Sequence, residues 1–201
     1  NDRLWYFILL IPAFGGLCTG LLLWFLARDQ KKQGIGSMID GFHNKRSRMS
    51  LKQSIVNLLA SVITLGTGGS AGREGPMAEA GAGFGSYLGM KLGLSQRERG
   101  LLLLAGAAGA ISALFRAPLG AALWALEILY KKDFESDAMF TCLVASVTAY
   151  SVFTSIYGQG SFFDVDASIL ASYSFEPSQL IFYGILGFMC APLGYIWIKS
   201  M

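Results

Sequence analysis

Long apolar segments, separated by short clusters of charged residues, constrain this chain more than any other feature of its sequence. Residues 4–27 contain no charged side chain, and a hydrophobic helix of about 20 residues is long enough to cross a bilayer. Only 14% of the 201 residues are charged, whereas a soluble domain has about 25%. We therefore expect an all-α, multi-pass integral membrane protein, which excludes a soluble globular domain.

Several other apolar segments are too short, or too interrupted by glycine and proline, to be simple spans. Residues 33–42 are expected to form a half-helix, and residues 100–114 and 118–129 a broken pair around Pro118. Broken helices at membrane depth are typical of ion and substrate sites. We expect one transmembrane unit over residues 1–201. Its predicted helices are residues 4–27, 33–42, 54–64, 76–90, 100–114, 118–129, 138–157 and 180–198.

The net charge of +3 comes from basic clusters between the apolar segments. We interpret these clusters as topology signals and contacts with lipid headgroups, and not as a nucleic-acid-binding surface. The three cysteines lie singly in apolar segments without metal-ligand spacing, so we interpret them as packed thiols, and we expect no metal and no cofactor. These cysteines are Cys18, Cys142 and Cys190.

Residues 66–76 place one arginine and one glutamate in glycine-rich backbone between two apolar segments. Gly72, Gly75 and Pro76 favour a turn that opens a helix. The first N–H groups of a helix have no partner within it and carry the positive end of its dipole, so they can bind an anion. Glu74 lies at this position. We therefore expect an anion site where the Glu74 carboxylate competes with a mobile anion.

Glu74 could instead be an exposed loop carboxylate or a structural partner for Arg73. Ser70 lies in a G-x-S-x-G pattern, which makes an intramembrane serine hydrolase a remote alternative. Its base would have to be His43, the only histidine, which lies in a basic polar loop. A membrane scaffold without transport is a third class. Glu127 is either a buried proton-relay carboxylate or a boundary charge, and the sequence leaves both open.

The five residues from Gly72 to Pro76 resemble the G(K/R)EGP signature of the CLC family of chloride channels and proton-coupled chloride transporters. Residues 115–121 resemble the family's F-N-A-P-L-A-G segment, and Glu127 falls where that helix carries an acidic residue. The resemblance implies the first half of an inverted-repeat fold of tilted and broken helices. It also implies that Glu74 is the extracellular gate.

A second segment, residues 32–36, aligns with the family's G-S-G-I-P segment, whose serine contacts the central chloride. Gln33 replaces that serine and can still donate through its side-chain amide. Ile128 replaces a second glutamate of the proton-coupled members, so we expect a channel or a weakly coupled transporter, with a strict antiporter as the alternative. The anion-binding residues that the resemblance implies are Gln33, Gly34, Ile35, Gly72, Arg73, Glu74 and Gly75.

The segment-by-segment match begins at the family's third helix and ends within its tenth. We therefore expect most of the second inverted half, which contributes another anion-coordinating turn, to be missing from this chain. The resemblance further implies chloride or a related small anion as the transported species, protons as a second partner, and a homodimer of the complete protein. The expected location is the lipid bilayer of the plasma or cell inner membrane.

Overall fold

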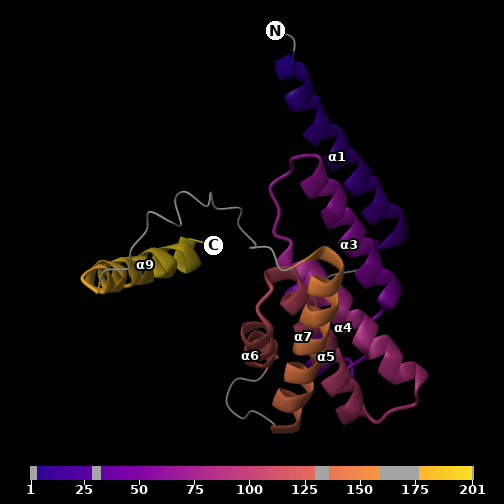
Figure 1. Ribbon diagram of the computed structural model, residues 1–201. Helices are drawn as coiled ribbons and strands as arrows, with labels where there is room; N and C mark the ends of the chain where they lie inside the picture. The colour runs from indigo at the N-terminus through magenta and orange to yellow at the C-terminus, as the bar shows by residue number, and fades with distance from the viewer. Residues whose placement is uncertain (1–3, 29–32, 130–135, 159–176, 201) are drawn as a thin grey trace. The chain divides into compact units, whose positions relative to one another are not determined.

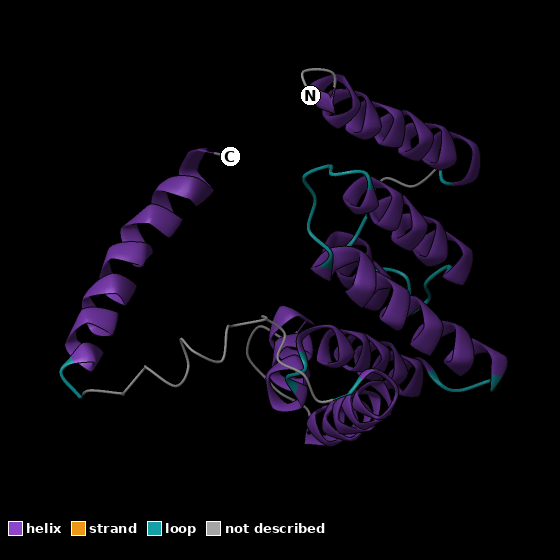
Figure 2. Cartoon of the chain, turned by 45° about the horizontal axis from the view of Figure 1, so that its top comes forward, coloured by secondary structure: helices purple, strands orange, loops and turns teal. Residues whose placement is uncertain are grey.

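The structure is a computed structural model, which describes residues 4–28, 33–129, 136–158 and 177–200. Every regular element in these ranges is an α-helix (Figures 1 and 2). The chain divides into two compact units, Asn1–Gly160 and Ser161–Met201, and each is described by itself. The single transmembrane unit over residues 1–201 stays a prediction.

The first unit contains all but one of the described helices, and each predicted helix is found within a few residues of its expected bounds. The half-helix is confirmed as a nine-residue element, and the broken pair is confirmed as two helices separated at Arg116, whose φ is 55°. The helices are α1 (Leu4–Leu26), α2 (Ile35–His43), α3 (Leu51–Gly66), α4 (Glu74–Lys91), α5 (Gln96–Phe115), α6 (Pro118–Leu129) and α7 (Ser136–Tyr157).

Helix α5 lies at the centre of the first unit and contacts α4, α6 and α7. On the other side of α4, helix α3 packs between α4 and α1 (Figure 1). The short α2 packs against α4 and α6. The buried core is built mainly from small and aliphatic side chains of α4, α5 and α6. Helix α4 is therefore held from several sides, which matters because it begins at Glu74.

Small residues let α4 and α5 approach closely. A Cβ on Gly81 would collide with the carbonyl oxygen of Gly106, and a Cβ on Gly85 would collide with that of Leu102. The four-residue glycine spacing predicted such an approach, and the structure confirms it. The backbone of α4 thus has a fixed position against α5.

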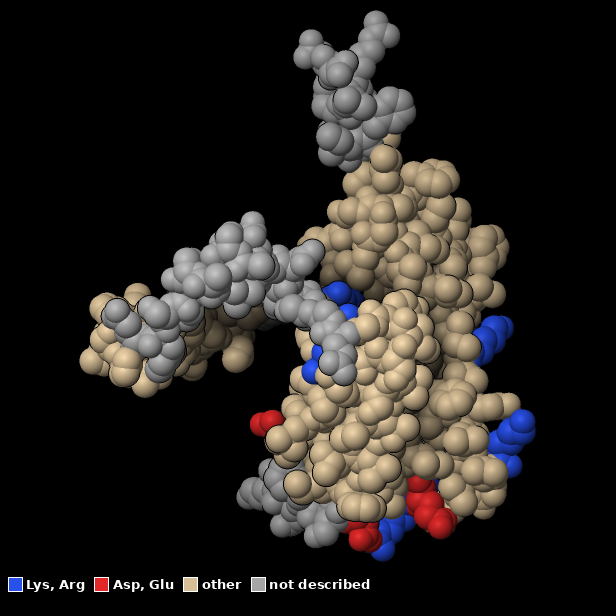
Figure 3. All heavy atoms as spheres, in the orientation of Figure 1, with Lys and Arg blue, Asp and Glu red and all other residues tan. Residues whose placement is uncertain are grey.

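The outside of the first unit is mostly apolar. Large side chains such as Phe14, Trp24 and Phe140 are exposed, and most of its visible face in Figure 3 is neither acidic nor basic. Helix α5 and the Asp137–Tyr157 part of α7 are long and apolar enough to cross a membrane. This exterior suits lipid or further apolar protein surface and supports the membrane assignment.

The described part of the second unit contains one helix, α9 (Gln179–Ser200). It is also long and apolar enough to cross a membrane, and none of its side chains is buried within the unit. The prediction of packed thiols is confirmed for Cys142, which is buried in α7, whereas Cys190 of α9 is exposed in the described part of the second unit.

Candidate functional site

The segment that joins α3 to α4 turns sharply through glycine. Helix α3 ends at Gly66, and Gly68 then takes a φ of 85°, which residues with side chains rarely adopt. The N–H of Gly69 donates to the carbonyl of Thr64 at 2.8 Å, so this part of the segment is held against the end of α3. The chain is then irregular until α4 begins at Glu74.

The start of α4 has the open N-terminus that the sequence predicted. Arg73 is the N-cap residue, its side chain makes no capping hydrogen bond, and Pro76 lies in the first turn. The first helical bond runs from the N–H of Met77 to the carbonyl of Arg73 at 3.2 Å. The N–H groups of Glu74 and Gly75 are therefore not used within the helix.

The Glu74 side chain folds back over its own turn. It is half-buried, and a Cβ placed on Gly72 would lie 2.8 Å from Glu74 Oε2. Only glycine at position 72 leaves room for the carboxylate in this place. The carboxylate thus lies against the turn where the sequence predicted its competition with a free anion.

The structure brings the two predicted anion-binding segments together. Gly34 is the N-cap residue of α2, with φ 61° and ψ −136°. A Cβ on Gly34 would lie 3.5 Å from the Cα of Gly75, and a Cβ on Gly75 would lie 3.9 Å from the backbone nitrogen of Ile35. The N-termini of α2 and α4 therefore meet, and both helix dipoles present their positive ends near the same place.

A cavity of about 190 Å³ lies beside this meeting point. It is lined by Gln33 and Gly34 from one segment and by Ala71, Gly72 and Pro76 from the other. The rest of the wall has polar side chains, from Thr19 of α1, Asn57, Ser61 and Thr64 of α3 and Glu79 of α4, and two apolar ones, from Leu23 and Ala60. A water molecule takes about 30 Å³ in the liquid, so the cavity has room for a small anion with some of its hydration.

Glu79 is the residue of this cavity that the sequence analysis missed. Its side chain is fully buried. Oε2 accepts a hydrogen bond of 2.7 Å from the N–H of Gly34, and the Nδ2 of Asn57 lies 3.0 Å from both carboxylate oxygens. A sequence signal did exist, because a glutamate within a segment of small and apolar residues is costly in a membrane and usually serves a function.

Of the remaining predicted residues, Gln33 lines the cavity, whereas Arg73, Glu127 and Ile128 do not. Arg73 is exposed, and Glu127 is exposed on α6, so the boundary interpretation of Glu127 fits the described part of the chain better than a buried relay. Ile128 packs in part against the hydrophobic core. Gln33 is exposed, and its anion-binding role stays a prediction.

The remote hydrolase alternative finds no support in the geometry. His43 lies at the C-terminal end of α2, and its Nε2 is 3.0 Å from the carbonyl oxygen of Leu129. This contact engages the imidazole on the side of α6, whereas Ser70 is exposed in the loop before α4. Within the described ranges, no group of three or more His, Cys, Asp or Glu residues is placed to hold a metal ion.

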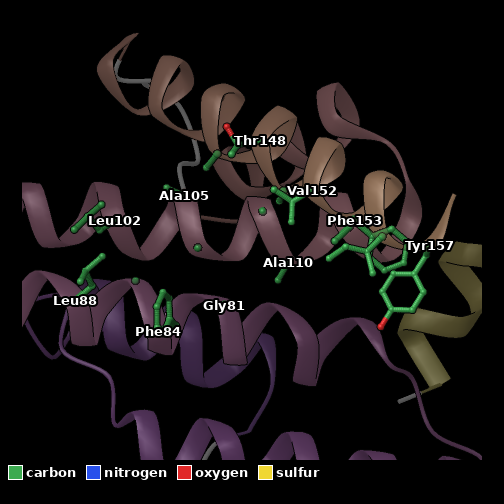
Figure 4. A pocket seen from close by; sticks show the side chains of 17 residues that line it. Gly81, Phe84, Leu88, Leu102, Ala105, Ala110, Thr148, Val152, Phe153 and Tyr157 are labelled. Atoms are coloured by element: carbon green, nitrogen blue, oxygen red, sulfur yellow. The ribbon is translucent and has the colours of Figure 1, made fainter. Parts of the chain in front are cut away.

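A larger hollow of about 750 Å³ lies over α5, between α4 and α7, and Figure 4 shows its lining. Phe153 and Tyr157 stand at one end and Leu88 and Leu102 at the other. None of the described residues that line this hollow is charged, and its wall is almost entirely apolar. An anion there would lose its hydration without compensation, so the smaller polar cavity is the candidate site.

Comparison with known proteins is consistent with this geometry. A family model described as "Voltage gated chloride channel" matches residues 15–201. The chain is 30% identical over 161 residues to a putative chloride channel protein ClcB-like of Ralstonia nicotianae, which covers 78% of this chain and 37% of that protein. It is 29% identical over 195 residues to the voltage-gated ClC-type chloride channel ClcB of Yersinia pestis, covering 96% and 46%.

A third relative is named for two anions. The chain is 29% identical over 145 residues to a chloride/fluoride channel protein of Pseudomonas syringae pv. tomato, which covers 72% of this chain and 32% of that protein. The chain thus spans less than half the length of each of these relatives. No solved structure matches it significantly.

Proposed function

The chain belongs to the voltage-gated chloride channel family, and from that premise we propose that the complete protein carries chloride or a related small anion across a membrane. The observation that supports this proposal most is the meeting of the α2 and α4 N-termini at Gly34 and Gly75, beside a polar cavity of about 190 Å³. Relatives named as chloride channels are consistent with it.

The physical basis of this proposal is the electrostatic field at the N-termini of α2 and α4. Backbone N–H groups at a helix N-terminus and the positive end of the helix dipole attract an anion without introducing a fixed positive charge. In a membrane this attraction is strong, because little water is present to screen it. Binding remains weak enough for release, since no lysine or arginine of the described residues lines the cavity.

Glu74 is the proposed gate. When it is deprotonated, its carboxylate lies against the turn at Gly72 and repels an arriving anion. Protonation removes the charge, weakens the attraction to the start of α4, and frees the site. Flux is therefore expected to rise as the pH falls.

Ile128 and Glu127 bear on the coupling to protons. Ile128 cannot carry a proton and packs in part against the core, and Glu127 is exposed on α6. Both observations favour a channel or a weakly coupled transporter, with a strict chloride/proton antiporter as the alternative. A proton-relay role for Glu127 would need a water path from its exposed position.

The experiment that tests the function uses the complete protein in liposomes. Chloride efflux is measured under a chloride gradient, and the reversal potential is then measured with and without a pH gradient. A reversal potential set by the chloride gradient alone indicates a channel, and a shift with the pH gradient indicates coupling. Absence of flux under every anion gradient would contradict transport and would favour a membrane scaffold.

The proposed assembly is a homodimer in the plasma or cell inner membrane, as in the complete proteins of the family that the sequence resembles. Size measurement of the complete protein in detergent checks it. A monomer that transports chloride would contradict the dimer and leave the transport function standing.

A further inference from the structure

Glu79 places a carboxylate in the wall of the candidate cavity, more than one turn further along α4 than Glu74. It is fully buried, whereas Glu74 is half-buried. Its carboxylate connects α4 to two other parts of the first unit. Oε2 accepts a hydrogen bond from the N–H of Gly34, just before α2, and both oxygens lie 3.0 Å from Asn57 Nδ2 of α3. The gate proposed above makes no use of this group.

The hydrogen bond from Gly34 has a direct consequence for anion binding. Gly34 belongs to the segment whose N–H groups are expected to hold the anion, and a backbone N–H offers one proton. With Glu79 Oε2 at 2.7 Å from this nitrogen, an anion cannot take the same position. A charged carboxylate in the wall of the cavity also repels an anion strongly, because the surroundings have a low dielectric constant.

We propose that Glu79 is a proton-dependent competitor for the anion inside the cavity. When charged, it holds the N–H of Gly34 and excludes the anion. When one proton binds to its carboxylate, the negative charge is lost, its hold on this N–H weakens, and the anion binds to Gly34 in its place. This inference rests on the proposed function and adds to it an inner site whose occupancy depends on a proton.

The ionisable groups on and around α4 are those that could contribute to the pH dependence of anion binding. Among the described residues that line the cavity, Glu79 is the sole ionisable one. Lys31 and Lys32 precede Gln33 in the sequence and lie outside the described residues. The other charged or titratable side chains on α4 and on the elements in contact with it do not line the cavity. They are Asp40 and His43 of α2, Lys52 of α3, Glu74, Tyr87 and Lys91 of α4 with Arg73 just before it, and Arg97, Glu98 and Arg99 of α5.

A purely structural role is the competing explanation, in which Glu79 only ties α2 to α3 and α4. The substitution Glu79→Gln distinguishes the structural role from the proposed role as a competitor. Glutamine has nearly the same size, and its amide oxygen can still accept the N–H of Gly34 when no anion is bound. A neutral amide holds this N–H more weakly than a carboxylate does, so an anion can displace it. It carries no charge and does not titrate. A structural tie would survive this change, whereas a charged competitor would be lost.

The test measures chloride binding to the complete protein in detergent by isothermal titration calorimetry, at acidic and at neutral pH. Glu74→Gln serves as the background, so that the proposed gate does not contribute to the pH dependence. In this background we expect tighter chloride binding at acidic pH. Adding Glu79→Gln should make binding independent of pH and roughly tenfold tighter at neutral pH. The matched control is Glu98→Gln, which removes an exposed carboxylate on α5 and should leave the chloride affinity and its pH dependence unchanged.

Equal chloride affinity and equal pH dependence with and without Glu79→Gln would overturn the inference. If that variant fails to fold, Asn57→Ala provides the second test in the same background. Loss of the Asn57 amide removes a donor that stabilises the charged Glu79 carboxylate. Chloride affinity should therefore begin to rise at a higher pH than in the background protein. An unchanged pH dependence would also overturn the inference. Absence of chloride binding and flux in the protein without substitutions would contradict the proposed function, which is a distinguishable result.

Discussion

Gly34 and Gly75 lie in backbone contact, and a Cβ on Gly34 would stand 3.5 Å from the Cα of Gly75. This contact joins the N-terminus of α2 to the N-terminus of α4, although the two helices are separated in the chain by all of α3. It places two helix dipoles beside one polar cavity. The φ of 61° disfavours a side chain at Gly34, whereas a Cβ on Gly75 would stand in ordinary van der Waals contact with the Cα of Gly34.

Substitution of Gly34 should damage the site through the backbone. Gly34→Ala puts a side chain at φ 61° and ψ −136°, which should destabilise the protein by about 1–3 kcal/mol and weaken chloride binding. Gly36→Ala is the control, because nothing lies within 4 Å of a Cβ there and alanine favours the helix. Thermal unfolding of the complete protein in detergent, together with chloride titration, measures both effects. Equal effects of the two substitutions would contradict the proposed importance of this backbone position.

Neutralising Glu74 should open the proposed gate. Glu74→Gln keeps the size of the side chain and removes its charge, so chloride flux at neutral pH should rise towards the flux at acidic pH, and its pH dependence should shrink. Liposome efflux across a pH series measures this. Glu98→Gln removes a charge from an exposed position near the start of α5 and should leave the flux profile as it was. A profile that Glu74→Gln leaves unchanged would remove Glu74 from the gating role.

A second acid beside Glu79 should make stability depend on pH. Asn57→Asp replaces an amide donor, 3.0 Å from both Glu79 oxygens, with a carboxylate, so two negative charges would face each other in a buried place. We expect a loss of about 3 kcal/mol at neutral pH. Protonation of either acid relieves the repulsion, so the stability should recover as the pH falls.

Thermal unfolding of Asn57→Asp over a pH series measures this recovery. Asn57→Ala is its control, because it removes the same amide donor without adding a charge and should show a weaker pH dependence. Parallel profiles for the two variants would contradict the close approach of residues 57 and 79.

The contact between α4 and α5 should tolerate no added methyl group at Gly85. Gly85→Ala drives a Cβ into the carbonyl oxygen of Leu102, and overpacking of this kind costs about 1–3 kcal/mol. Gly20→Ala in α1 is the matched control, since a Cβ there meets nothing within 4 Å. Thermal unfolding in detergent compares the two, and equal stability of both variants would show that α4 and α5 can move apart without cost.

The helices themselves were predictable because their signals are local. Long apolar segments, glycine and proline breaks, and the start of α4 near Pro76 depend on neighbouring residues along the chain, and each predicted helix was found close to its expected bounds. The signature around Glu74 also identified the family, which the family match confirms. The gating role of Glu74 and the anion-binding roles stay predictions.

The sequence by itself determined which segments are helices, that they belong in a membrane, and that Glu74 stands at a helix N-terminus. Only the tertiary structure decided that Gly34 meets Gly75 and that Glu79 accepts the N–H of Gly34 while contacting Asn57. The physical reason is that local sequence governs backbone conformation, whereas the partners of a buried carboxylate depend on how distant helices pack. The sequence alone shows that Glu79 is an energetically costly glutamate in a helix of small residues, but its hydrogen-bond partners follow only from the packing of the helices.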